Sequence, residues 1–142
     1  MKRSVLILCG ENFDEVAAVT FAAGLRTVGI RVQLVSTGGT LLRGRHGITV
    51  QCDVTLSDVL AGDSHIGAVV LVPAAASPIA DPRLELLLRR AVAADALLVG
   101  PPRLMHAAQQ ATMGSMRDDH YISYHNGRAV AEVTEELVRL LL

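Results

Sequence analysis

The sequence predicts an α/β fold, a three-layer α/β/α sandwich around a flavodoxin-like, mostly parallel sheet. Short apolar runs bounded by glycine or proline alternate with longer segments whose apolar residues recur at helical spacing. The apolar runs are continuous rather than alternating, which is typical of strands buried on both faces of a parallel sheet. Right-handed crossovers between such strands favour a flavodoxin-like strand order.

Composition predicts a single domain over residues 1–142. Of these residues, 51% are hydrophobic and 19% are charged, enough for a sizeable core. A net charge of −1 and an aromatic content of 3% disfavour nucleic-acid binding, because they supply neither a basic field nor a stacking surface. No run of about twenty apolar residues is present, so we expect no membrane span.

Cysteine usage and the lack of known binding motifs further limit the functions that the sequence predicts. Cys9 and Cys52 do not make a disulfide framework in a chain of this size, so we expect a reducing, cytoplasmic setting. The first apolar run stops at Gly10, too early for a signal-peptide core. Neither a dinucleotide fingerprint nor a Walker loop is found, and no histidine or cysteine pair has metal-ligand spacing. We therefore expect neither a cofactor nor a metal.

The first elements form a βαβ unit. Val5 to Cys9 is a buried strand, and either Asn12 or Asp14 caps the helix that follows. Gly29 ends this helix, and Ile30 to Val35 forms the second strand.

The remaining elements continue the alternation. Asp81 and Pro82 have the residue types preferred at the N-cap and first position of a helix. Residues 111–127 are polar and are expected to be irregular. The other expected elements are a small hairpin over 41–51, a short helix over 56–60, strands over 68–72 and 96–99, a helix from 101 or 102, and an amphipathic helix over 132–142.

The segment from Ala96 to Leu104 is the most informative junction, a buried strand followed by a glycine turn and a helix start. At such junctions α/β enzymes often display a nucleophile at the carboxyl edge of the sheet. This junction offers Leu98 and Val99, neither of which has a nucleophilic group.

Four parts of the chain together resemble the DJ-1/PfpI (ThiJ/PfpI) superfamily, over about residues 2–105. The resemblance implies the fold described above, a small-molecule ligand and a homodimer in which Arg45 to Cys52 is the natural contact segment. The matching parts are the strand–loop–helix of 5–30, the segment Arg45-His46-Gly47-Ile48-Thr49-Val50 followed by Asp53-Val54-Thr55-Leu56, the strand 68–73 followed by 81–84, and Leu97-Leu98-Val99-Gly100-Pro101.

The resemblance also implies where the family's catalytic groups would fall. The family uses a cysteine on the strand–turn–helix junction, an acid at the start of the first helix and a Gly-Gly loop after the third strand. Matched to this sequence, the cysteine falls on Leu98 and the histidine after it on Val99. The acid falls on Ala17, and the loop on Ala74-Ala75. We therefore expect a divergent member that lacks the family nucleophile, so the family's glyoxalase-like, amidase, chaperone and isonitrile-hydrating activities are not expected to carry over directly.

Five residues remain candidates for catalysis. Cys9 lies at the carboxyl edge beside a helix N-terminus, which lowers a thiol's pKa, although a buried core cysteine is the other interpretation. Glu11 and Asp14, which surround the same helix start together with Glu15, are candidate acids or bases, or simply complement the helix start. His120 and His125 lie in a polar-aromatic cluster and could titrate near neutral pH beside the pocket, or could lie on a surface loop.

Two functions stay open. In the first, the chain is an enzyme that acts on a small, largely apolar metabolite by non-covalent acid–base chemistry of the lyase, isomerase or cyclase type. Acyl transfer fits less well, because it needs a nucleophile and oxyanion donors. In the second, the chain is a non-catalytic pseudoenzyme that serves as a dimeric binding or interaction protein. The expected pocket-lining residues are Ala74, Ala75, Leu98, Val99 and Gly100.

Overall fold

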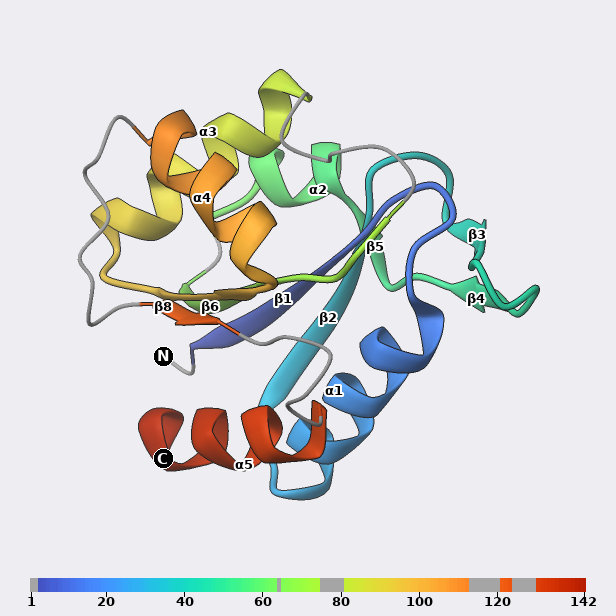
Figure 1. The fold of residues 1–142 in the computed structure, drawn as a ribbon. Helices are drawn as coiled ribbons and strands as arrows, with labels where there is room; N and C mark the ends of the chain where they lie inside the picture. Colours follow the sequence, from blue (N-terminus) through green and yellow to red (C-terminus); the bar gives the residue numbers. More distant parts are fainter. Residues whose placement is uncertain (1–2, 64, 75–80, 113–120, 124–129) are drawn as a thin grey trace.

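Figure 1 shows the computed structural model, which describes residues 3–63, 65–74, 81–112, 121–123 and 130–142. Its main sheet has six strands in the order β5-β2-β1-β6-β7-β8, and every pair of neighbours is parallel. The strands are β1 (Ser4–Cys9), β2 (Arg31–Ser36), β5 (Val54–Thr55), β6 (Ile66–Leu71), β7 (Leu97–Gly100) and β8 (Tyr121–Ser123). The order β2-β1-β6-β7-β8 is flavodoxin-like, as predicted.

Helices cover both faces of this sheet. One layer contains α1 and α5, and the other contains α2, α3 and α4 (Figure 1). The predicted three-layer sandwich is therefore confirmed. The helices are α1 (Glu15–Thr27), α2 (Leu56–Ala61), α3 (Pro82–Ala93), α4 (Pro102–Ala111) and α5 (Val130–Leu141). None of the helices among the described residues has the length and apolar character needed to cross a membrane.

The central strand β1 explains why the sequence shows a continuous apolar run. All of its residues are buried. Val5, Ile7 and Cys9 pack into the apolar cluster under α1 and α5, while Leu6 and Leu8 pack into the cluster under α2, α3 and α4. Successive side chains of a strand point to opposite faces, so a strand with helices on both sides needs apolar residues at every position.

The helix starts follow the capping signals in the sequence. The Asp14 carboxylate accepts a hydrogen bond from the Ala17 N–H (3.1 Å), so Asp14 rather than Asn12 caps α1. Asp81 caps α3, with proline at the first helical position. Gly29 follows α1 with a φ of +85°, a backbone conformation that glycine adopts without strain.

A small hairpin lies beside the main sheet, as predicted. Its strands β3 (Leu41–Arg43) and β4 (Thr49–Gln51) pair antiparallel and form a sheet of their own. The hairpin projects from the body next to the start of α1 (Figure 1). We call residues 41–51 the arm.

The prediction of an irregular segment over 111–127 was wrong in one place. Strand β8 lies within it and pairs with β7, with Leu98 opposite Tyr121 and Gly100 opposite Ser123. A strand this short, set among polar residues, has no apolar run or periodicity of its own. It forms because the edge of β7 offers unpaired backbone groups.

Candidate functional site

The carboxyl edge of the sheet between β1 and β6 is the topological switch point, where ligands bind in open α/β sheets. The loops that leave these two strands touch there. The Asp14 N–H donates to the Pro73 carbonyl (2.8 Å), and a Cβ on Gly10 would lie 3.8 Å from the Ala74 Cβ. Glu11 is exposed in the turn between these contacts. Glu11 and half-buried Ala74 therefore lie at the carboxyl edge of the sheet, where the sequence predicts the ligand site.

Leu98 and Val99 lie in the core beneath this edge. Both side chains are 0% exposed. Leu98 packs into the cluster on the α3 and α4 side, and Val99 packs into the cluster on the α1 and α5 side. Gly100 is buried as well. Three of the expected pocket-lining residues thus belong to the packed interior.

The backbone at this junction is also that of an ordinary strand. Leu98, Val99 and Gly100 all pair with β8. In the described part of the chain the only non-glycine residues with positive φ are Asn12 and Asp95. A nucleophile elbow holds its reactive residue on a sharp, strained turn. Here the strand runs straight through that position, and the side chains alternate between the two cores.

Cys9 lies at the edge but does not face solvent. Its side chain is 0% exposed, and its thiol donates to the Ile7 carbonyl (3.6 Å). The neighbouring Cys52 thiol, together with burial, raises the pKa of Cys9 well above its ordinary value. This arrangement keeps Cys9 protonated and favours its interpretation as a core residue.

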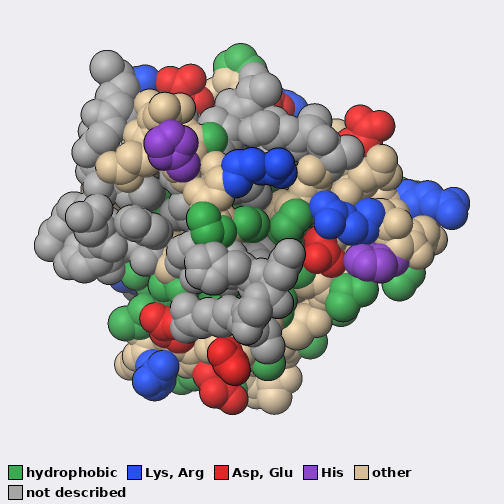
Figure 2. Space-filling model, viewed as in Figure 1, with side chains coloured by type: hydrophobic (Ala, Val, Ile, Leu, Met, Phe, Trp, Pro, Cys, Tyr) green, Lys and Arg blue, Asp and Glu red, His purple; other side chains and the backbone are tan. Residues whose placement is uncertain are grey.

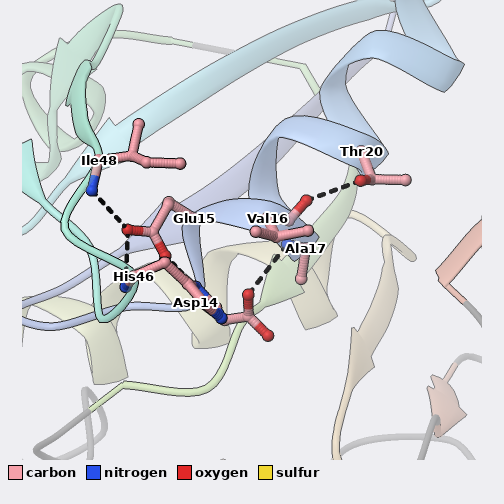
Figure 3. Close-up of polar contacts among 7 residues, drawn as sticks. All are labelled: Asp14, Glu15, Val16, Ala17, Thr20, His46 and Ile48. Atoms are coloured by element: carbon pink, nitrogen blue, oxygen red, sulfur yellow. Dashed lines mark hydrogen bonds and ion pairs between the residues drawn. The ribbon is translucent and has the colours of Figure 1, made fainter.

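Glu15, which lies beside the predicted site residues Glu11 and Asp14 at the helix start, is the carboxylate that the structure buries. Its side chain is 1% exposed, and it faces the turn of the arm (Figure 3). It accepts hydrogen bonds from the backbone N–H of His46 (3.0 Å) and of Ile48 (3.1 Å), and it also pairs with the His46 ring Nδ1. We call this set of interactions the Glu15 clamp.

The electrostatics of the clamp favour an ionised Glu15. Burial alone would raise the pKa of this carboxyl group, but hydrogen bonds from His46 and Ile48 lower it to about 2. The Arg45 N–H adds a bond to the Phe13 carbonyl (2.9 Å). A Cβ on Gly44 would lie 2.0 Å from Glu15 Oε2, so the turn approaches this closely only because residue 44 is glycine. The clamp holds the arm against the start of α1.

Asp14, Glu15 and His46 also form a cluster of possible metal ligands, with one ligand atom from each lying within 4.8 Å of the others. Both Glu15 oxygens already accept N–H groups, and one Asp14 oxygen caps α1. A cation would have to compete with these bonds, so we interpret the cluster as structural. Acidic, basic and histidine side chains lie together over this part of the surface (Figure 2), where Arg43, Arg45 and His46 are exposed.

The remaining sequence candidates fall into two groups. His120, His125 and Ala75 lie outside the described residues. Asp14 is present at the edge, but as a helix cap. Glu15 could have been found from helical spacing, because it shares the buried face of α1 with Ala18, Ala22 and Leu25. An acid on that apolar stripe predicts a buried carboxylate that needs hydrogen-bond donors.

Comparisons with known proteins agree on one family. The sequence profile of the DJ-1/PfpI family matches residues 3–97. An oxidised DJ-1 from Toxoplasma gondii superimposes with a TM-score of 0.80 at 18% identity, covering 98% of this chain and 90% of that one. A mutant of a DJ-1 superfamily protein from Salmonella typhimurium gives 0.77 at 18% identity, covering 98% and 88%.

A ThiJ/PfpI domain protein from Brachyspira murdochii gives a TM-score of 0.78 at 13% identity, covering 99% of this chain and 98% of that one. These structural matches extend past residue 97, where the match to the family profile ends. A search of curated proteins gives no match.

Replacing Glu15 with glutamine should weaken the fold and change its response to acid. The pKa of Glu15 is lowered from 4.5 to about 2, so its contribution to stability is complete above about pH 4.5 and is lost as the pH falls toward 2. Glu15→Gln should therefore unfold at lower urea concentration near neutral pH and lose less further stability over that acid range. Urea unfolding at a series of pH values, with exposed Glu11→Gln as the control, measures this. A Glu15→Gln curve parallel to that of wild type would contradict the clamp.

Proposed function

Because the chain belongs to the DJ-1/PfpI family, we propose that it is a non-catalytic member that acts by binding, as a homodimer, without thiol chemistry. One observation carries the proposal. Leu98, which the sequence resemblance aligns with the family nucleophile, is a fully buried core side chain in a regular strand.

The burial of Leu98 matters because nucleophilic catalysis places two requirements on the residue at this position. A catalytic nucleophile must reach its substrate and must be activated by a neighbouring group. Leu98 has no reactive atom, and its side chain is 0% exposed. Ala17, which aligns with the family acid, presents only a methyl group and is 4% exposed. Both halves of the proposed ancestral pair have become packing residues, which supports the loss of that chemistry.

The described ionisable groups at this edge have structural tasks, with one exception. Asp14 caps α1, Glu15 holds the arm, and Cys9 is buried and protonated. Glu11 is exposed at the switch point and caps no helix. Its position favours a second candidate function, acid–base catalysis on a small, largely apolar metabolite, with His120 or His125 as its partner.

An activity assay on the Glu11→Gln variant separates the two functions. We expect the wild-type protein to turn over α-oxoaldehydes, small amides and isonitriles no faster than buffer, as followed by proton NMR. General acid–base groups contribute about a hundredfold or more to rate. The proposal would be overturned if the wild-type protein turned over one of these compounds and Glu11→Gln lowered the rate about a hundredfold or more. The exposed-surface control Glu132→Gln should leave that rate unchanged.

The dimer part of the proposal is supported by exposed apolar side chains around the Glu15 clamp. On α1, Val16 is 52% exposed and Val19 is 47% exposed. On the arm, Leu41 is 66% exposed and Ile48 is 54% exposed. Val16 follows Glu15 directly, and Glu15 binds the Ile48 N–H, so Val16 and Ile48 are exposed close to where α1 and the arm join (Figure 3). Val19 lies one helical turn further along α1. Exposed apolar patches of this kind mark interaction surfaces.

A charge placed in this patch should separate the dimer. We expect wild type to sediment as a dimer, and Val19→Asp to weaken association at least tenfold, about 1.4 kcal/mol, because the carboxylate would lose its hydration in the interface. The matched control is Leu86→Asp on α3, where the native side chain is 48% exposed. Analytical ultracentrifugation over a concentration series measures both. A monomeric wild type, or a Val19→Asp chain that associates as tightly as wild type, would contradict the proposed surface.

A further inference from the structure

A groove lies on the surface where α5 packs across α1 (Figure 1). Its volume is about 340 Å³, within the range of about 300–1,000 Å³ that is typical of small-molecule sites. We call it the α1–α5 groove. Helix α1 and the residue that caps its end supply Thr20, Gly24 and Val28, and α5 supplies Ala131, Thr134 and Val138.

A glycine allows the two helices to approach closely at this groove. A Cβ on Gly24 would lie 2.7 Å from the methyl carbon of Thr134, closer than two carbon atoms approach without repulsion. Helix α5 can therefore lie this close to α1 because residue 24 has no side chain. For the same reason, Gly24 contributes only backbone to the lining of the groove.

The lining of the groove is apolar, although it includes two threonines. The Thr20 hydroxyl donates to the Val16 carbonyl (2.7 Å), and the Thr134 hydroxyl donates to the Val130 carbonyl (2.8 Å). Both hydroxyl protons are thus used within their own helices, so a ligand would meet mainly hydrocarbon groups. Val28 is 46% exposed, and covering such apolar surface favours binding.

One charged side chain, that of Glu135, also lines the groove. It is exposed, and it forms no ion pair or side-chain hydrogen bond with any residue that the structure describes. Arg139, one helical turn further along α5, is exposed and is not part of the lining. An apolar groove with an unpaired carboxylate is complementary to an apolar molecule that carries one positive charge.

We propose that the α1–α5 groove binds a small aliphatic amine, with its hydrocarbon body against the two helices and its ammonium group beside Glu135. This site rests on the proposed function in one respect, that the chain acts by binding, and it adds the class of ligand. It does not depend on the dimer, because Val16 and Val19 do not line the groove. An aliphatic carboxylate would meet Glu135 with like charge, which disfavours it.

Titration of the wild-type chain with 1-aminoadamantane tests the site directly, because this probe is a compact hydrocarbon cage with one ammonium group. Methyl NMR spectra follow the binding. We expect saturable shifts centred on the methyl groups of Val28, Ala131 and Val138. Adamantane-1-carboxylate, which has the same cage and the opposite charge, should bind more weakly. Shifts that do not saturate, shifts centred on other residues, or equal binding of the two probes would overturn the proposal.

Two substitutions of exposed residues test the role of charge. Glu135→Gln should weaken binding of 1-aminoadamantane about two- to fivefold, the size of an exposed ion pair, whereas Glu132→Gln, outside the lining, should leave it unchanged. Val28→Lys should weaken binding of the amine and strengthen that of the carboxylate. The matched control is Leu86→Lys on α3, where the native side chain is 48% exposed. An amine affinity that is the same in Glu135→Gln and wild type would contradict the proposed site.

The same titration distinguishes a ligand site from a surface between two copies of the chain. If a second copy filled the groove, the probe would bind Val19→Asp monomers but not the wild-type dimer, and this result would rule out the ligand site. We expect wild type and Val19→Asp to bind the probe equally. A monomeric or catalytically active wild type would contradict the proposed function, whereas only the titration decides the groove, so the two failures are distinguishable.

Discussion

The buried carboxylate of Glu15 is the interaction on which the arrangement of the carboxyl edge depends. It is 1% exposed, and it accepts the backbone N–H groups of His46 and Ile48. Removing its charge would leave these donors without a strong partner in a place with little access to water. Because the clamp holds the turn of the arm, it also keeps the exposed Ile48 beside the start of α1.

The same edge shows how strand β7 packs into both cores at the position that the sequence resemblance aligns with the family nucleophile. Strand β7 ends at Gly100, at the carboxyl edge of the sheet. Its side chains alternate between the two apolar clusters. Apolar residues at 98 and 99 allow β7 to remain regular, and Leu98, Val99 and Gly100 pair with β8. A reactive side chain on a strained turn costs stability. The buried Leu98 carries no such cost, and this supports the proposed binding function.

Local sequence signals predicted the fold, but contacts between residues distant in sequence could not be predicted from them. The apolar run of Val5 to Cys9 and the Asp81-Pro82 pair predicted a buried strand and a helix start, and both are confirmed. Strand β8 and the burial of Glu15 depend on partners far along the chain, on β7 and on the arm. Propensity and periodicity describe neighbours in sequence, so they carry no information on such pairings.

The central claim is that position 98, which the sequence resemblance aligns with the family nucleophile, is closed to solvent, and a cysteine placed there tests it. In Leu98→Cys, the new thiol should react with iodoacetamide at neutral pH only as the chain opens, many times more slowly than the same protein in urea. Peptide mapping separates residue 98 from Cys9 and Cys52. If residue 98 in the folded chain is alkylated as fast as in the unfolded chain, the pocket is open and the account of a packed, non-catalytic edge is contradicted.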